Sequence, residues 1–283
     1  MHKKIGYQLH AATQAFAAPA HSSTTIRALN LCMAPGGHAS TILRVNPTAS
    51  VNGITLSEES GGYAMILPFG NEDPRVDVKF MDITMLAVEF GPSKANIPIA
   101  HPEAAKFVED SPYQNLAFDI VACEGQNLRT HKRAACRDNQ EASRLLLSQL
   151  IFGMNRIRAG GTLVVLLHQL GSWNSMKLLR AFDSFSKIQL FKSRKFHQNR
   201  SSFYLVAKDV QPDVPEAIKS IEQWKIDWWQ TTFGGVEFTG AIVEDDSVLV
   251  NSVLESFGDK FMELAREIWE IHLEAMKAAP YVK

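Results

Sequence analysis

The sequence predicts an α/β fold with a doubly wound, mostly parallel sheet of seven strands, an antiparallel edge strand and a C-terminal helical appendage. Short apolar runs alternate with stretches of helical period, which is typical of a parallel sheet covered by helices on both faces. The run at 162–167 is apolar throughout, as expected of a strand buried on both faces. A short basic segment joins the last two strand-like runs. It is too short for a helical crossover and therefore predicts an antiparallel pair.

The elements can be assigned in order along the chain. We expect seven strands, at residues 26–32, 51–55, 75–80, 118–123, 162–167, 187–191 and 202–207. Helices are expected at 38–45, 140–157 and 173–185, and Gly160-Gly161 is expected to end the second of them. We expect residues 1–210 to form one domain and residues 211–283 to form a helical extension, with helices at 215–232 and, as one or two, at 246–278. Lone helices of this kind need docking for stability, so we expect the extension to pack on the sheet domain.

Composition excludes several classes of protein. The chain has 283 residues, 46% of them hydrophobic, and a net charge of −1, so the whole molecule is not a polycation. Its cysteines, Cys32, Cys123 and Cys136, are too far apart for a metal-binding pattern and predict no metal site. The chain has neither an apolar run of membrane-spanning length nor a signal core, so we expect a cytoplasmic protein with no membrane partner, with the nucleus left open.

The charge is unevenly distributed. Basic residues gather between Arg129 and Arg137 and between Lys187 and Arg200, whereas the last forty residues are mostly acidic. These stretches form either a basic patch offset by an acidic tail or two solvated faces.

The segment from Leu29 to Gly37 (LNLCMAPGG) reads as a buried strand, a tight turn and the start of a helix. Glycines in such a turn let the backbone approach a ligand, and the helix N-terminus favours a carboxylate. The third glycine of a dinucleotide motif is missing, so a pyrophosphate is disfavoured and the carboxylate of S-adenosylmethionine fits better. The cofactor-binding residues predicted here are Ala34, Pro35, Gly36, Gly37 and His38. The alternative is a turn that simply needs glycine.

Other candidates lie at the ends of later strands, where ligands bind in open α/β sheets. Thr55, Asp82 and Ile83 are expected to contact the cofactor, with Asp82 either accepting a hydrogen bond from the adenine amino group or capping a helix. Glu124 is a candidate base, orienting group or counter-charge, and otherwise a capping acid. His168 is a candidate for proton transfer, against a structural hydrogen-bonding role. Two further histidines, His131 and His197, are weaker candidates in the basic stretches.

Together these pieces resemble the FtsJ-like (RrmJ-like) methyltransferase family, and a fungal branch of it most closely. The pieces that carry the resemblance are LNLCMAPGG, FDIVACEGQ, RAGGTLVVLL and NRSSFYLVAK, together with the Asp82 region, over roughly residues 28–209. The resemblance implies a Rossmann-like seven-stranded methyltransferase sheet and S-adenosylmethionine as cofactor. In the best-known members it also implies 2′-O-methylation of RNA ribose.

Those members use a Lys–Asp–Lys–Glu tetrad, and this sequence departs from it. The aspartate position falls on Glu124, the central lysine on Leu166 or beside His168, and the glutamate on Ser202. The first lysine matches Lys3 or Lys4 only weakly. Leucine cannot activate a ribose hydroxyl.

Three interpretations remain open. The first is a methyltransferase for a small molecule, with a closed apolar pocket that the tryptophan-rich helix around Trp224 and Trp229 would cover as a lid. The second is an RNA methyltransferase with one continuous basic surface. The third is a degenerate protein that binds the cofactor and either catalyses a non-methylating reaction or acts as a scaffold.

Overall fold

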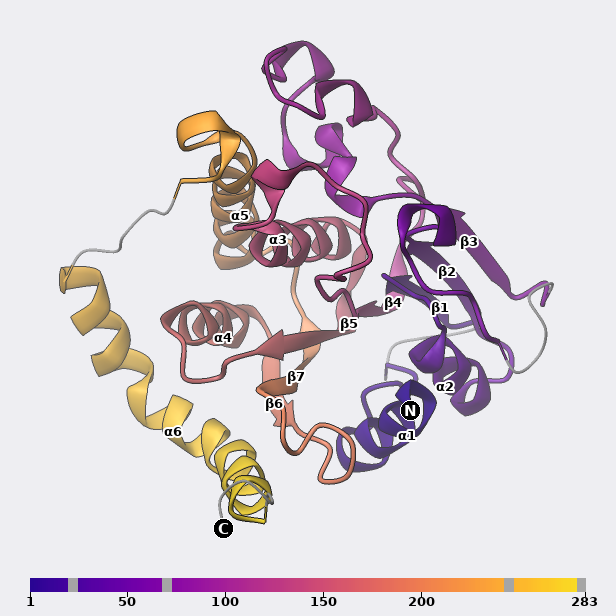
Figure 1. The fold of residues 1–283 in the computed structure, drawn as a ribbon. Helices are drawn as coiled ribbons and strands as arrows, with labels where there is room; N and C mark the ends of the chain where they lie inside the picture. The colour runs from indigo at the N-terminus through magenta and orange to yellow at the C-terminus, as the bar shows by residue number, and fades with distance from the viewer. Residues whose placement is uncertain (20–24, 68–72, 242–246, 279–283) are drawn as a thin grey trace.

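The computed structural model describes residues 1–19, 25–67, 73–241 and 247–278. Its centre is a seven-stranded sheet with the order β3-β2-β1-β4-β5-β7-β6 (Figure 1). The strands are β1 Arg27–Leu31, β2 Ser50–Thr55, β3 Val76–Phe80, β4 Phe118–Cys123, β5 Ile157–His168, β6 Lys187–Phe191 and β7 Ser202–Val210. Strands β1 to β5 pair in parallel, whereas β7 runs antiparallel to both β5 and β6. The predicted fold class is confirmed.

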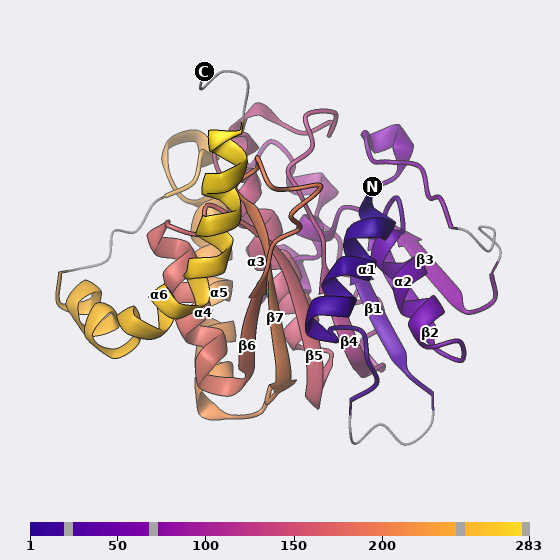
Figure 2. The same ribbon diagram turned by 90° about the horizontal axis from the view of Figure 1, so that it is seen from below.

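Helices cover both faces of the sheet (Figures 1 and 2). The helices are α1 His2–Thr13, α2 Gly37–Val45, α3 Glu141–Met154, α4 Trp173–Phe185, α5 Pro215–Phe233 and α6 Ser247–Lys277. α1 and α2 share one apolar cluster with one face of the sheet, and α3 to α6 share a larger cluster with the other face. This division follows from strand geometry, because successive side chains of a strand, such as Ala28 and Leu29, point to opposite faces of the sheet.

The C-terminal extension docks on the sheet domain, as expected. Helix α5 packs on α3 and α4, and α6 packs on α4 and β6 (Figure 2). The buried stripe on α6 includes Val253, Phe257 and Phe261. Among the described residues α6 is a single helix of 31 residues; the expected helix start at Asp246 lies outside them. None of the described helices is both long and apolar enough to span a bilayer.

Three parts of the fold differ from the sequence prediction. Helix α1 was not predicted. Strand β5 begins at Ile157, so the prediction that Gly160-Gly161 separates a helix from a strand starting at 162 is wrong. Gly160 lies inside β5 with a φ of 78°, where glycine permits an irregularity that would strain other residues. The third difference is that the connection from β3 to β4 contains four short 3₁₀ turns, at Ile83–Met85, Ala87–Phe90, Lys94–Asn96 and Ala104–Lys106.

The strand order reverses between β1 and β4. From β1 the chain continues to β2 on one side of this point, and from β4 it continues to β5 on the other side. In open α/β sheets ligands bind at this switch point, beyond the carboxyl ends of the strands. The start of α1 also reaches this edge, where His2 and Lys3 lie against Gly37.

Candidate functional site

A cavity lies at the carboxyl ends of β1 to β4. Its volume, including the open mouth, is about 1140 Å³. The strand ends contribute Cys32 after β1, Thr55 at the end of β2, Asp82 after β3 and Glu124 after β4. The remaining lining residues come from the start of α1, from β2 and α3, and from five loops, and are Met1, His2, Ala34, Ile54, Leu56, Gly62, Tyr63, Met81, Ile83, Gln126, Asn127, Leu128, His131, Glu141, Leu145, His197 and Arg200.

Two of these loops meet each other beside the cavity. The hydroxyl of Thr130 donates to the carbonyl oxygen of Gly61 (2.6 Å), and the amide of Lys132 donates to the carbonyl oxygen of Ser60 (3.1 Å). Gly61 has a φ of 91°, and a Cβ there would lie 1.8 Å from the carbonyl oxygen of Thr130. The contact therefore requires glycine, and it fixes the loop after β2 against the loop after β4.

Glu124 carries a buried carboxylate at the cavity. Its side chain is 9% exposed, and Oε2 lies 2.9 Å from Nδ1 of the fully buried His38. The other oxygen, Oε1, has no hydrogen-bond partner among the described residues. Because buried polar atoms are normally paired, this orphaned oxygen in the cavity lining indicates a place for a polar or cationic ligand group.

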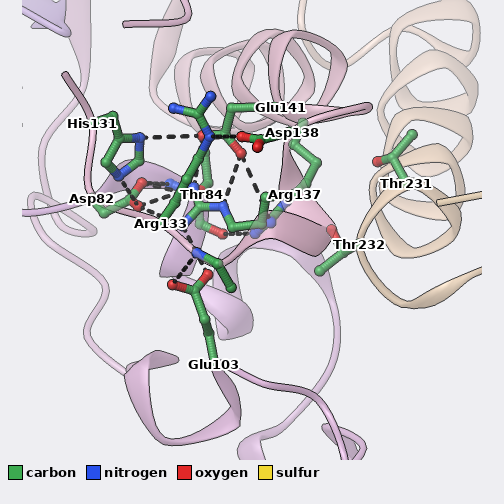
Figure 3. Close-up of polar contacts among 12 residues, drawn as sticks. Asp82, Thr84, Glu103, His131, Arg133, Arg137, Asp138, Glu141, Thr231 and Thr232 are labelled. Carbon is green, nitrogen blue, oxygen red and sulfur yellow. Dashed lines mark hydrogen bonds and ion pairs between the residues drawn. The ribbon is translucent and has the colours of Figure 1, made fainter. Parts of the chain in front are cut away.

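Asp82 lies within a cluster of charged side chains (Figure 3). Its Oδ1 accepts hydrogen bonds from the amide (3.0 Å) and hydroxyl (2.8 Å) of Thr84, so the capping role is confirmed. Its Oδ2 accepts from Nη1 and Nη2 of Arg137, both at 3.1 Å, and lies 3.3 Å from Nε2 of His131. Asp82 thus caps a 3₁₀ turn, binds two cations and still lines the cavity.

The same cluster extends from Arg137 and His131 to two more carboxylates. Arg137 donates to Glu141 (2.7 Å) and to Glu103 (3.1 Å), while Nδ1 of His131 lies 3.5 Å from Glu141 (Figure 3). Burial lowers the pKa of His131, but the contacts with Asp82 and Glu141 outweigh burial and raise it to about 9. His131 is therefore a cation at neutral pH, joining the end of β3 to the start of α3.

The glycine-rich loop packs closely against other parts of the chain. The amide of Ala34 donates to the hydroxyl of Thr55 (3.2 Å), which ties the loop to β2. A Cβ at Gly36 would lie 2.8 Å from Leu67, and one at Gly37 would lie 2.4 Å from the Cβ of His2. Both glycines thus make room for other parts of the chain, while Ala34 of the same loop lines the cavity. That the backbone of the glycines also approaches a ligand stays a prediction.

Five predicted site residues line the cavity, namely Ala34, Thr55, Asp82, Ile83 and Glu124. The others lie outside its lining: Pro35, Gly36 and Gly37 form the turn before and into α2, and His38 lies behind Glu124. His168 is exposed at the end of β5, where it pairs with Ser202, and also lies outside the lining.

Some residues that line the cavity were weak site candidates from the sequence, or were not candidates at all. His2, His197 and Arg200 line the cavity at the side of α1 and of the loop between β6 and β7. The basic composition of that loop was the available sequence signal for His197. No periodic pattern placed the start of α1 beside the cavity.

The tryptophan-rich helix is not a lid. Trp228 is fully buried, with its ring centroid 4.6 Å from that of Phe90, and Trp224 stacks on Phe182 at 5.7 Å. Helix α5 lies on the α3–α4 face, and neither Trp224 nor Trp229 lines the cavity.

The strand order with its single reversed strand, and a cavity at the carboxyl ends of β1 to β4, define the fold of S-adenosylmethionine-dependent methyltransferases. A family model described as FtsJ-like methyltransferase matches residues 2–210, and the chain belongs to this family. No curated protein gives a significant sequence match.

Several solved structures are similar at low identity. A putative ribosomal RNA methyltransferase from Plasmodium falciparum is 17% identical, with 73% of this chain and 97% of that chain covered and a TM-score of 0.45. Human methyltransferase-like protein 13 in complex with SAH is 10% identical, with 87% and 98% covered and a TM-score of 0.44. An rRNA methylase from Streptococcus thermophilus is 9% identical, with 72% and 96% covered and a TM-score of 0.44. These scores are too low to support a functional argument.

Proposed function

We propose that this protein is an S-adenosylmethionine-dependent methyltransferase whose acceptor is a small molecule. The observation that carries the proposal is the orphaned carboxylate oxygen of Glu124 in the cavity of a chain that belongs to a methyltransferase family. When bound, S-adenosylmethionine supplies a methyl group on a positively charged sulfur.

The residues of the cavity fit this cofactor. The buried carboxylate of Glu124 is a counter-charge for a cationic group. Asp82 and Ile83 at the end of β3 would hold the adenine, and Thr55 and Ala34 would lie nearer the ribose and amino-acid part. His38, in contact with Glu124, fixes the position of the carboxylate.

Pairing of three cations within the basic stretches, Arg137, Lys192 and Arg194, favours a small molecule over the ribose 2′-hydroxyl of RNA. Arg137 is buried among carboxylates, and the ammonium of Lys192 is buried against backbone carbonyls. Arg194 lies 3.2 Å from Glu267 and 3.6 Å from Glu274 on α6. Side chains paired in this way do not release counterions from RNA phosphates, so they contribute little to RNA binding.

A degenerate cofactor-binding protein is the second candidate. Leu166 and Ser202, at the tetrad positions, are 5% and 3% exposed, and both lie in the β5–β7 ladder. Neither side chain can lower the pKa of an acceptor hydroxyl, so methyl transfer would depend on other residues of the cavity.

The first experiment measures binding of S-adenosylmethionine and S-adenosylhomocysteine by calorimetry, since only the former carries the sulfonium charge. We expect Glu124→Gln to weaken S-adenosylmethionine binding by about tenfold, or 1.4 kcal/mol, and to weaken S-adenosylhomocysteine binding much less. The exposed Glu59, outside the cavity lining, provides the matched control Glu59→Gln. Equal loss for both ligands would refute the counter-charge role, and no binding by the wild type would refute the proposed cofactor.

The second experiment tests the reaction. Methyl-labelled S-adenosylmethionine is incubated with the protein and either total RNA or a cell extract freed of macromolecules. We expect label in the small-molecule pool. Label in RNA would overturn the proposed acceptor class, whereas binding without transfer to either pool would favour the degenerate protein.

A further inference from the structure

The loop between β6 and β7 places a buried imidazole in the cavity lining. His197 is 2% exposed, and its Nδ1 has no hydrogen-bond partner among the described residues. Because buried polar atoms are normally paired, an unpartnered nitrogen on a residue that lines the cavity points to a partner supplied by a ligand.

The position of His197 is fixed from several sides. The ammonium of Lys192 donates to the carbonyl oxygens of Arg200 and Ser202, closing the loop at its base. The hydroxyl of Ser193 donates to Oε1 of Gln8 on α1 (2.7 Å) and accepts from the amide of Phe196 (3.1 Å). A loop held in this way keeps the imidazole in one place without help from a ligand, which is what preorganised catalysis requires.

The imidazole is linked through one tyrosine ring to Leu166, the position to which the resemblance assigns the family's central lysine. Its ring is parallel to that of Tyr204, with an interplanar angle of 7° and a centroid distance of 6.3 Å. Tyr204 is the ladder partner of Leu166, and its ring also contacts His38, the neighbour of Glu124. The loop thus places a proton-accepting group one side chain away from the tetrad position that leucine occupies.

The surroundings keep this imidazole uncharged. Burial, and then the positive charges of Arg200, His2, Lys192 and His168, lower the pKa of His197 to about 4. A neutral imidazole has one unprotonated nitrogen, which accepts a proton or a hydrogen bond. His197 is therefore ready to act as an acceptor at physiological pH.

We propose that His197 is a catalytic residue that binds the nucleophilic hydroxyl of the acceptor and takes up its proton during methyl transfer. This inference rests on the proposed function. In the step, the hydroxyl oxygen forms a bond to the methyl carbon, and the carbon–sulfur bond breaks with its electron pair remaining on sulfur. The proton of the hydroxyl moves to Nδ1 of His197. A weakly basic imidazole suffices, because an oxygen becomes strongly acidic as it gains the methyl group.

The experiment compares the full-length wild type with His197→Phe, His168→Gln and His10→Gln. Phenylalanine keeps the ring beside Tyr204 but removes both nitrogens, whereas His168 is the alternative histidine at the end of β5. His10 lies outside the cavity lining and serves as the control for loss of an imidazole. Each variant is assayed for S-adenosylhomocysteine binding by calorimetry and for label transfer from S-adenosylmethionine to the small-molecule pool.

We expect His197→Phe to bind S-adenosylhomocysteine like the wild type while its transfer rate at saturating cofactor falls about 100-fold or more. Nitrogen-15 NMR of the imidazoles should show His197 neutral, with Nδ1 unprotonated, between about pH 5 and pH 8.

Three results would overturn the role of His197 but not the proposed function. They are a transfer rate that stays at the wild-type value in His197→Phe, a loss of transfer rate in His168→Gln but not in His197→Phe, and a cationic His197 at neutral pH. Wild-type protein that binds cofactor but transfers no label would instead overturn the proposed function, and the inference with it.

Discussion

At Gly37 the chain has room for hydrogen only. A Cβ there would lie 2.4 Å from Cβ and 2.7 Å from the carbonyl carbon of His2, so a larger residue must push the start of α1 away. We expect Gly37→Ala to destabilise the protein by about 1–3 kcal/mol, the usual cost of overpacking, and to weaken cofactor binding because His2 lines the cavity. Thermal denaturation and calorimetry check this. Gly171→Ala, where nothing lies within 4 Å of the added methyl group, should change neither, and unchanged values for Gly37→Ala would contradict the packing role.

His131 makes stability depend on pH in the alkaline range. Its pKa is raised from 6.5 to about 9 in the folded protein, so its contribution is complete below about pH 6.5 and is lost as pH rises through 9. The shift corresponds to up to about 3 kcal/mol, shared with Asp82 and Glu141. We expect the free energy of unfolding from urea titrations to fall between about pH 7 and pH 10 in the wild type, and this slope to flatten in His131→Gln. An equal slope in both proteins would show that His131 does not carry it.

Elements with a strong local pattern could be predicted from the sequence, and elements defined by distant contacts could not. β4 was predicted at its observed bounds, 118–123, because a short, mostly apolar run that ends at the polar segment starting with Glu124 needs no other information. Helix α1 lacks such a pattern, and its buried residues, Ile5 and Leu9, are recognisable only once α2 and the sheet are present. The candidate site follows the same rule. Strand ends identified Asp82 and Glu124, whereas His2 reaches the cavity through tertiary packing.

Helix α6 is held to the sheet domain by an apolar stripe. Phe257 is 4% exposed within the larger core cluster, whereas Met262 is 53% exposed on the same helix. We expect Phe257→Ala to lower the free energy of unfolding by about 3 kcal/mol because it leaves a cavity between helices. Met262→Ala should change the free energy by less than about 0.5 kcal/mol, as is usual for exposed positions. Urea titrations of both variants give the comparison, and equal effects would mean that α6 does not depend on this stripe.

Over the whole molecule, opposite charges that are distant in sequence lie beside each other. The basic loop after β6 meets acidic residues of α6 at Arg194, and the basic loop after β4 is joined to carboxylates through Arg137. The net charge of −1 follows from composition alone, whereas the pairing determines where the charges lie. Such pairing holds two of the loops beside the cavity.

This charge pairing predicts weak and nonspecific binding to RNA. We expect a labelled structured RNA to bind with a dissociation constant no tighter than about 10⁻⁶ M at physiological salt, since that is the range of sequence-independent electrostatic binding. Raising the salt from about 50 to 200 mM should abolish this binding, while S-adenosylmethionine binding at the proposed site in the cavity should change little. The double variant Glu267→Gln/Glu274→Gln frees Arg194 and should strengthen RNA binding, which ties the effect to the pairing on α6. Nanomolar binding by the wild type that survives 200 mM salt would contradict the charge argument and favour an RNA acceptor.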